Sequence, residues 1–181
     1  MIIKTGRFGS LTIDENEIIK IGGGLLGLSE YSQFCLVDPG DETLILWLQS
    51  LDHPDLAFPV LEPKIFKSGY IVRLSALELK ELDLKDITTA AVFSILTIPE
   101  DVTQMTANLK APVVINLTNQ KAKQVVLQEN EYQIKQSVFK ELRTHLLTIQ
   151  SNQNRLEQDT PQRTVLDVAK LAPSHFIKSL S

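Results

Sequence analysis

Residues 90–98, Ala-Ala-Val-Phe-Ser-Ile-Leu-Thr-Ile, are the stretch that indicates the fold most directly. The stretch is rich in apolar, β-branched and aromatic residues, contains neither glycine nor proline, and is followed at once by Pro99. Such a composition favours a β-strand that packs against neighbouring strands. Because a strand needs partners, the rest of the chain is expected to supply them.

Similar short runs recur on both sides at close spacing, separated by Gly, Pro, Asn and Asp. They are Phe8 to Ile13, Glu17 to Ile21, Phe34 to Val37, Thr43 to Leu51, Leu56 to Leu61, Tyr70 to Leu74, Val113 to Leu117, Lys123 to Gln128 and Tyr132 to Lys135. Strand and helix patterns do not alternate as a parallel α/β sheet requires. The sequence predicts a mainly β protein, built as an antiparallel distorted barrel or sandwich.

Two helices are predicted beside the strands. Ser75-Ala76-Leu77-Glu78 is a capping box, in which the Ser hydroxyl and the Glu carboxylate bind backbone N–H groups of the first turn. Later, Val138, Leu142, Leu146 and Ile149 recur at helical spacing behind Ser137, which is expected to act as the cap. We therefore expect one short internal helix and a C-terminal helical extension.

The sequence predicts three regions: a β domain at 1–136, an amphipathic helix at 137–150, and a polar linker and tail at 151–181. Ser151 to Arg163 holds few large apolar residues, so it buries too little surface to offset the entropy of ordering it. Thr164 is expected to cap a last short helix that ends at Pro173.

Composition fits a soluble domain with a real core, since 43% of the residues are hydrophobic. The single cysteine, Cys35, lies in the apolar run Phe34 to Val37, which predicts a buried and unreactive thiol. No apolar stretch reaches the ~18 residues of a membrane span, and the amino terminus does not look like a signal peptide. We therefore expect a cytoplasmic protein with no membrane anchor.

The charge is distributed unevenly along the chain. Residues 1–135 carry 12 Lys and Arg against 18 Asp and Glu, a net charge of −6, and the remainder carries 6 against 4, or +2. An acidic surface is unsuited to nucleic acid, which is bound through clustered Lys and Arg. A basic protein partner would suit such a surface better than nucleic acid, but solubility alone is the preferred explanation of mild acidity.

Two motifs suggest small-molecule chemistry. Gly22-Gly23-Gly24-Leu25-Leu26-Gly27 has the glycine spacing of a dinucleotide site, but no full helix fits after it and Asp38 comes too early. A glycine-rich bend is the favoured interpretation. Ser50, Asp52 and His53 bring triad residue types together, which leaves open an alternative: a small-molecule-binding or hydrolytic β-barrel. Closeness in sequence is weak support, since a triad is defined by geometry, and a turn before Pro54 explains the cluster.

No metal, cofactor or catalytic site is predicted. His53, His145 and His175 lie far apart, and no His or Cys pair has the spacing of a metal site. The acidic residues Glu78, Glu81, Asp83 and Asp86 are more typical of a solvated face around a short helix than of a cation site.

Three segments together resemble the FliW family of flagellar assembly factors. The first is the Phe8 strand with Gly24 to Leu28 and Phe34, and the second is Leu48-Gln49-Ser50 with Phe58-Pro59-Val60. The third and most specific is Asn108-Leu109-Lys110-Ala111-Pro112-Val113-Val114-Ile115-Asn116, followed by Gln124 to Leu127 and Tyr132. The resemblance covers about residues 1–140, and the extension beyond them has no role that it implies.

The resemblance implies a non-enzymatic protein that binds newly made flagellin and also binds CsrA, a small basic RNA-binding repressor of flagellin translation. A protein that binds flagellin alone remains a further alternative. The motif residues are expected to be structural: Asn108 should bind backbone in a turn, and Pro112 should begin a strand. The same structural role is expected of Gly24, Gly27, Leu48, Gln49, Ser50, Leu109, Asn116 and Gln124. Partner binding is assigned to acidic residues, namely Glu78, Glu81, Asp83, Asp86 and Glu62.

Overall fold

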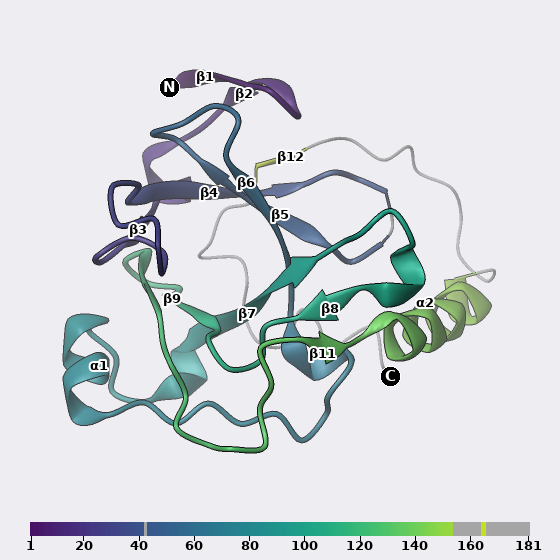
Figure 1. Cartoon of the computed structure of the whole chain (residues 1–181). Coiled ribbons are helices and arrows are strands. Elements are labelled where there is room, and N and C mark those ends of the chain that lie inside the picture. Colours follow the sequence, from purple (N-terminus) through teal and green to yellow (C-terminus); the bar gives the residue numbers. More distant parts are fainter. Residues whose placement is uncertain (42, 154–163, 166–181) are drawn as a thin grey trace.

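The computed structural model describes residues 1–41, 43–153 and 164–165. Seven strands close a barrel in the order β7, β6, β5, β4, β3, β10, β9 and back to β7 (Figure 1). Neighbours run antiparallel, except that β10 runs parallel to β3. The bounds are β3 Ile19–Ile21, β4 Gln33–Asp38, β5 Leu46–Ser50, β6 Ala57–Leu61, β7 Ala90–Thr97, β9 Val113–Asn116 and β10 Lys121–Gln124. The predicted mainly β class is confirmed, and the architecture is a barrel.

Five further strands of the described residues lie outside this ring. β1 (Ile2–Thr5) and β2 (Gly9–Thr12) form a hairpin, β8 (Thr106–Ala107) pairs with the second half of β7, and β11 (Gln136–Ser137) pairs with β8. β12 (Thr164–Val165) runs antiparallel to the end of β4. The expected helix start is not seen at Thr164 and Val165, because Val165 lies opposite Val37 in this strand pair, and the remaining residues of that predicted helix lie outside the described residues.

The barrel interior is a packed apolar core. Alternate residues of each strand point inward, as the pleat requires, and they include Phe34, Leu48 and Ile115, all at most 1% exposed. Half-buried side chains from the surrounding loops, such as Leu28 and Tyr31, close the core at its margin.

Three further clusters pack against the outside of the barrel. The β1–β2 hairpin covers one face of β4, where Cys35 is fully buried beside Phe8 and Val37. Burial, together with the charge of Glu17, raises the pKa of the Cys35 thiol to about 12. The predicted burial of this cysteine is thus confirmed.

The short helix α1 (Ala76–Glu81) begins at the predicted capping box. The Ser75 hydroxyl accepts the Glu78 N–H at 3.3 Å, and the Glu78 carboxylate accepts the Ser75 N–H at 2.7 Å. These bonds satisfy donors that the first turn leaves unpaired. Leu79, Leu82 and Leu84 turn to the cluster that also contains Tyr70 and Tyr132.

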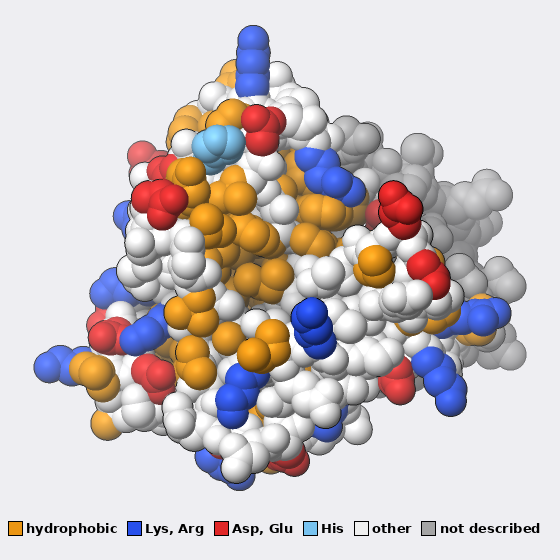
Figure 2. Space-filling view, viewed as in Figure 1, with side chains coloured by type: hydrophobic (Ala, Val, Ile, Leu, Met, Phe, Trp, Pro, Cys, Tyr) orange, Lys and Arg blue, Asp and Glu red, His pale blue; other side chains and the backbone are white. Residues whose placement is uncertain are grey.

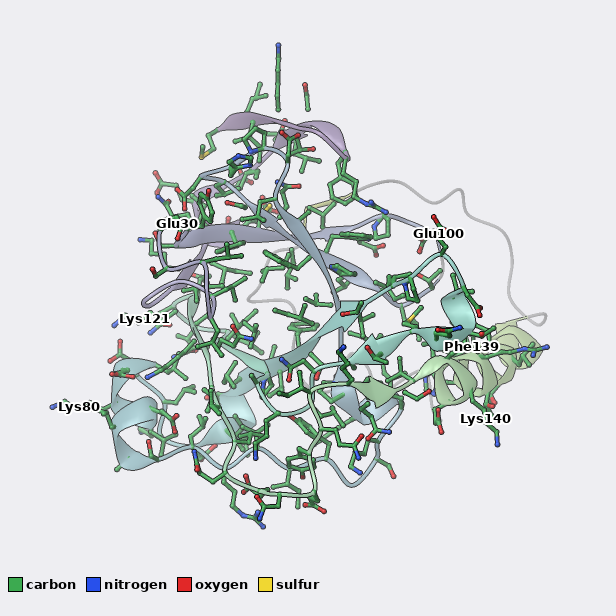
Figure 3. The ribbon with its side chains drawn as sticks, in the orientation of Figure 1. Glu30, Lys80, Glu100, Lys121, Phe139 and Lys140 are labelled. Atoms are coloured by element: carbon green, nitrogen blue, oxygen red, sulfur yellow. The ribbon has the colours of Figure 1, made fainter. Side chains whose placement is uncertain are left out.

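The long helix α2 (Phe139–Gln153) packs by its predicted apolar positions: Val138, Leu142 and Leu146 meet Leu61 and Leu96. Figure 3 shows Lys140 pointing away from the barrel at the start of this helix. Ser137 is not the cap, because its backbone pairs with Thr106 in β11. The helix runs to Gln153, so the first three residues of the predicted linker are helical. Residues 154–163 and 166–181 of the predicted linker and tail lie outside the described residues.

Two predicted strands are wrong: Tyr70 to Leu74 and Tyr132 to Lys135 belong to no strand. Their backbone groups bind locally or bind each other's side chains: the Tyr70 N–H donates to the Lys67 carbonyl, and the Ile71 N–H donates to the Tyr132 hydroxyl. Both segments have a strand-like composition because they must bury Tyr70, Val72 and Tyr132 against the barrel.

Candidate functional site

The segment that identifies the family is shaped by Asn108. Its Oδ1 accepts N–H groups from Lys110 at 3.1 Å and from Ala111 at 3.0 Å, while its own N–H donates to the Ile95 carbonyl. The predicted amide-to-backbone turn is confirmed. Pro112 then stands directly before β9, and its carbonyl accepts the Val125 N–H at 2.9 Å.

Asn116, at the other end of β9, ties α1 to the barrel. Its buried amide nitrogen donates to the carbonyls of Leu82 at 2.8 Å and Asp83 at 3.2 Å, and its Oδ1 accepts the Thr118 N–H. Asp83 has a positive φ of 53°, so the chain that leaves α1 turns sharply at this point. The amide therefore satisfies carbonyls that the helix end leaves without partners.

Gln124 joins the glycine-rich loop to the same segment, since its Oε1 accepts the Leu26 N–H and its Nε2 donates to the Ala111 carbonyl. Within the loop Gly24 has φ of 68°, and a Cβ built there would lie 2.6 Å from the Leu28 carbonyl oxygen. Antiparallel strands flank the loop and no helix lies between them. A glycine-rich bend is what forms here, and the geometry of a dinucleotide site is absent from this described loop.

Gln49 and Ser50 likewise form hydrogen bonds with backbone groups, in the turn after β5. Gln49 is fully buried, and its Nε2 donates to the carbonyls of Ser50 at 2.9 Å, Pro54 at 3.2 Å and Leu56 at 3.1 Å. The Ser50 hydroxyl accepts the N–H groups of Asp52 and His53, both at 3.1 Å. The neighbouring family residues Leu48 and Leu109 are core residues, at 1% and 0% exposure.

The side chains of Ser50, Asp52 and His53 are therefore used in turns. The Asp52 carboxylate accepts the Ser32 and Gln33 N–H groups, and His53 Nδ1 accepts the Asp55 N–H. Each polar group binds backbone, whereas a hydrolytic triad requires them to bind one another. The packed barrel interior also disfavours the small-molecule alternative, which calls for a cavity in the barrel mouth.

The acidic residues around α1 are occupied by local contacts. Glu78 closes the capping box, Glu81 forms an ion pair with Lys123, and Asp83 forms one with Lys121, which lies across from α1 in Figure 3. Asp86 caps the 3₁₀ turn Ile87–Thr89, and hydrogen bonds from the Thr88 hydroxyl and N–H lower its pKa. Two of these four acids thus have their charge offset by lysines of β10.

Within the described residues, no group of His, Cys, Asp or Glu has the arrangement needed to hold a metal ion. None of the described helices combines the length and the apolar character needed to cross a bilayer.

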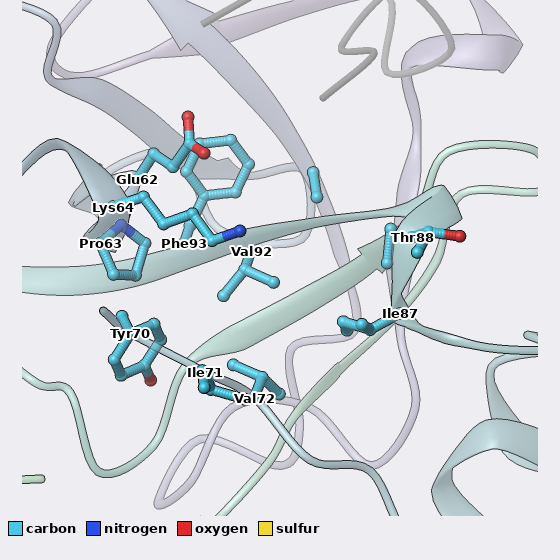
Figure 4. A pocket seen from close by; sticks show the side chains of 12 residues that line it. Glu62, Pro63, Lys64, Tyr70, Ile71, Val72, Ile87, Thr88, Val92 and Phe93 are labelled. Atoms are coloured by element: carbon cyan, nitrogen blue, oxygen red, sulfur yellow. The ribbon is translucent and has the colours of Figure 1, made fainter. Parts of the chain in front are cut away.

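A groove of about 310 Å³ lies beside the first half of β7 (Figure 4). Its floor and walls come from the ends of several elements: Glu62 to Lys64, Tyr70 to Val72, Ile87 and Thr88, and Ala90 to Phe93. The groove exists because β6 ends at Leu61, where Pro63 starts the 3₁₀ turn Pro63–Ile65 and carries the chain away from β7. Proline has no N–H for a ladder bond, so it ends the pairing there.

The outer wall of the groove is held by two tyrosines. The Tyr70 hydroxyl donates to the Leu109 carbonyl at 2.7 Å, the Ile71 N–H donates to the Tyr132 hydroxyl at 2.9 Å, and the two rings lie 4.6 Å apart. Burial raises the pKa of the Tyr70 hydroxyl, and Tyr132 and Glu129 add to the shift. The family segment therefore positions this wall, while the Ile71 side chain is left 51% exposed.

Glu62 is the predicted partner-binding residue that lines this groove. Its Oε2 is buried and has no hydrogen-bond partner among the described residues, and burial raises its pKa although Lys64 opposes the shift. The α1 acids Glu78, Glu81 and Asp83 are not among the lining residues. Sequence reasoning missed Ile71 and Val92, because Pro63 signals the end of a strand but not which neighbouring edge is left open.

Fold and site together define a class of protein: a small closed β-barrel, covered by a hairpin and two helices, with an apolar groove along one barrel strand. Comparison with known proteins gives the family. The family model described as FliW protein matches residues 2–138. The chain belongs to the FliW family.

Relatives and a solved structure agree with this assignment. A protein of Bdellovibrio bacteriovorus named "Flagellar assembly factor FliW" is 40% identical over 169 residues, covering 93% of this chain and 94% of its own. One of Caldanaerobacter subterraneus subsp. tengcongensis, with the same name, is 37% identical and covers 79% and 96%. A crystal structure of the flagellar assembly factor FliW superposes with a TM-score of 0.72 at 33% identity, covering 77% of this chain and 97% of that one.

The Bdellovibrio relative also bears on the extension. An alignment that covers 93% of this chain must include most of the residues after 138, where the family model ends. Part of the sequence after residue 138 is therefore shared with at least this member of the family.

Proposed function

We propose that this protein is a flagellar assembly factor that binds flagellin and antagonises the translational repressor CsrA, so that flagellin synthesis follows flagellin export. One observation carries the proposal: the 40% identity, over nearly the whole of both chains, to a protein named as a flagellar assembly factor. Flagellin and CsrA are the partners that the family resemblance implies. The protein acts by binding and not by catalysis, and it acts in the cytoplasm, where both partners are made.

The surface supports a role in binding proteins. Hydrophobic side chains gather across the middle of the face shown in Figure 2, and charged side chains are scattered around the margin of that area. An exposed apolar area with a polar rim is typical of protein-binding surfaces. The net charge of −6 over residues 1–135 also suits a basic partner.

The proposal is tested with the purified chain and the purified flagellin and CsrA of the same bacterium. Calorimetry is expected to show binding of each, and added flagellin is expected to displace CsrA from a preformed complex. Binding of flagellin without CsrA would restrict the function to assembly alone. If the unmodified protein bound neither, the proposed function would be wrong.

A further inference from the structure

We propose that the groove beside β7 binds an extended segment of another protein, which adds a strand to the free edge of β7 and brings a Lys or Arg side chain to Glu62. This inference goes beyond the proposed function, because it concerns a particular surface and holds whichever proteins the chain binds. It is carried by the geometry of the strand edge, the lining of the groove and the charge at its end.

One edge of β7 is open. On one side, β9 pairs with the four residues Ala90 to Phe93. On the other side β6 pairs only with Ser94 and Ile95. In the part of the chain that the structure describes, no strand pairs with Ala90 to Val92 on that second side. The groove lies along this edge, as Figure 4 shows for Val92.

The backbone groups of Val92 point toward the groove. The Thr89 carbonyl accepts the Leu117 N–H, and the Ile95 carbonyl accepts the Asn108 N–H, so the odd-numbered residues of β7 face β9 and β8. Because successive residues of a strand direct their groups to opposite sides, the N–H and carbonyl of Val92 face the groove. Continuing the β6 register from Leu61 opposite Ser94 would put Pro63 opposite Val92, and proline cannot donate.

Unpaired ladder groups specify the occupant. A donor and an acceptor spaced along a strand edge are satisfied by another extended backbone, which is the basis of strand addition in peptide recognition. The segment Tyr70 to Val72 stands opposite as a wall, so the edge is recessed and accessible to a single inserted segment. The recess also explains how an open edge avoids the edge-to-edge aggregation that exposed strands invite.

The side chains of the groove favour an aliphatic residue in that segment. Val92, Ile71, Val72 and Ile87 line the space. Ile71 is 51% exposed, so an inserted aliphatic side chain would cover apolar surface that water now contacts.

The charge at the groove end favours a basic neighbour to that residue. Glu62 Oε2 is buried without a hydrogen-bond donor among the described residues, a costly state for a carboxylate. Lys64 lines the same groove, but it is exposed, and its side chain extends toward β7 in Figure 4. A Lys or Arg from the partner would therefore gain more at Glu62 than an acidic residue would gain at the hydrated Lys64.

The test uses the full chain and a phage-displayed library of random dodecapeptides, since the natural segment is unidentified. The selected peptides are expected to alternate aliphatic and polar residues and to carry Lys or Arg. When a selected peptide is added as a synthetic compound, hydrogen exchange at the Val92 amide is expected to slow, because that N–H becomes bonded to the peptide.

Matched variants locate the binding. Ile71→Asp places a charge on the exposed wall and is expected to abolish binding, whereas Leu77→Asp, a 63% exposed position on α1, should leave it unchanged. Glu62→Gln should lower the affinity for the basic peptides about tenfold, the usual loss when a charge-assisted hydrogen bond is removed. Glu30→Gln is its control, because Glu30 lies beside β3 and β4 in Figure 3 and does not line the groove.

Several outcomes would overturn the proposal. They are a library that yields no binder, peptides that bind Ile71→Asp as well as the unmodified chain, and peptides that leave exchange at Val92 unchanged. A Val92 amide that is already protected in the free chain would show that the groove is filled by the protein itself or by a second copy. If Ile71→Asp failed to fold, as judged by circular dichroism, exchange at Val92 in the unmodified chain would decide alone.

Discussion

At the scale of single residues, the polar side chains that identify the family bind backbone groups. Asn108, Asn116, Gln49 and Gln124 each connect chain segments through two or more hydrogen bonds. A side-chain amide has both a donor and an acceptor, so it can complete turns whose backbone groups have no strand or helix partner. These residues therefore maintain the surface on which binding depends.

Asn108→Ala is expected to lower the free energy of unfolding by about 1 to 3 kcal/mol, because two turn N–H groups lose their acceptor. Urea denaturation measures the change, and Asn130→Ala, at an exposed asparagine, is the control. Binding of flagellin or CsrA should weaken only in proportion to unfolding. Unchanged stability with lost binding would instead place Asn108 in an interface.

Gly24→Ala is expected to destabilise the fold more than Gly27→Ala. Both positions have positive φ, 68° and 83°, so both substitutions carry a backbone strain of about 1 to 2 kcal/mol. Only Gly24 adds a collision, since its Cβ would lie 2.6 Å from the Leu28 carbonyl oxygen, whereas nothing lies within 4 Å at Gly27. Thermal unfolding of the two variants is the measurement, and equal losses would contradict the close backbone approach.

Glu62→Gln is expected to stabilise the protein at pH 7 and to have little effect near pH 4. Burial raises the pKa of Glu62 above its ordinary 4.5, so below that value the residue is protonated in both the folded and the unfolded state. As pH rises through the folded-state pKa, the buried carboxyl ionises and its stabilising contribution is lost. Glutamine carries no charge and avoids this loss.

Urea titrations at both pH values measure the effect of Glu62→Gln. Asp86→Asn is the comparison of opposite sign, because hydrogen bonds from Thr88 lower the Asp86 pKa below 3.8. Its stabilising contribution is present above that value and is lost only as pH falls further, so Asp86→Asn should be destabilised at pH 7 and still near pH 4, where Glu62→Gln has little effect. A Glu62→Gln variant destabilised at pH 7 would show that the carboxylate has a partner.

At the scale of elements, the barrel depends on short segments that cover its outside. The hairpin β1–β2, the helix α1 and the helix α2 each bury one apolar cluster against barrel strands. Where such cover is missing, beside Val92, the strand edge is left as a groove. A strand edge or face is either packed against another element or left open to bind a partner. The three packed clusters are examples of the first case, and the groove beside Val92 is an example of the second.

Leu142→Ala is expected to cost about 2 to 4 kcal/mol, because this leucine is 4% exposed and joins α2 to Leu61 and Leu96. Leu77→Ala, at a 63% exposed helical position, should change stability little. Chemical denaturation of both variants is the measurement. A small loss at Leu142 would mean that the extension folds apart from the barrel, as the predicted boundary at 136 proposes.

At the scale of the whole molecule, long-range charge is the property that concerns the proposed partners. The residues up to 135 carry −6, but Glu81 and Asp83 are paired with lysines, so the α1 acids supply less field than their number suggests. Glu30 and Glu100 are exposed and lie on opposite sides of the molecule in Figure 3. Substitutions at Glu30 and Glu100 are therefore a better test than substitutions near α1 of which side of the molecule attracts a basic partner.

Association with CsrA is expected to slow as ionic strength rises from about 0.05 to 0.5 M, with a smaller change in dissociation, because salt screens the charges that steer encounter. Glu30→Lys and Glu100→Lys, compared by stopped-flow kinetics, should show which side faces the partner. An association rate that is independent of salt would remove electrostatic steering as the reason for an acidic body.

The sequence by itself determined which parts of the chain form strands and helices, wherever a local pattern suffices. The run at 90–98, the capping box at Ser75 and the helical spacing of Val138, Leu142 and Leu146 gave β7, α1 and α2. It also determined the backbone-binding role of Asn108, since that role acts over only a few residues. Tyr70 to Leu74 was wrongly predicted as a strand, because an apolar composition shows that a segment is buried but not that it pairs with another strand.

Only the tertiary structure decided how the strands pair and what lies between them. Closure of the barrel joins β7 to β9 and β10 to β3, pairs that no local pattern specifies. The groove is lined by Glu62, Ile71 and Val92, which come from three separate segments. No spacing of residues in the sequence therefore predicts it. Local chemistry determines elements because their hydrogen bonds connect near neighbours, whereas an open edge is the absence of a distant partner, and only the complete fold shows which partner is absent.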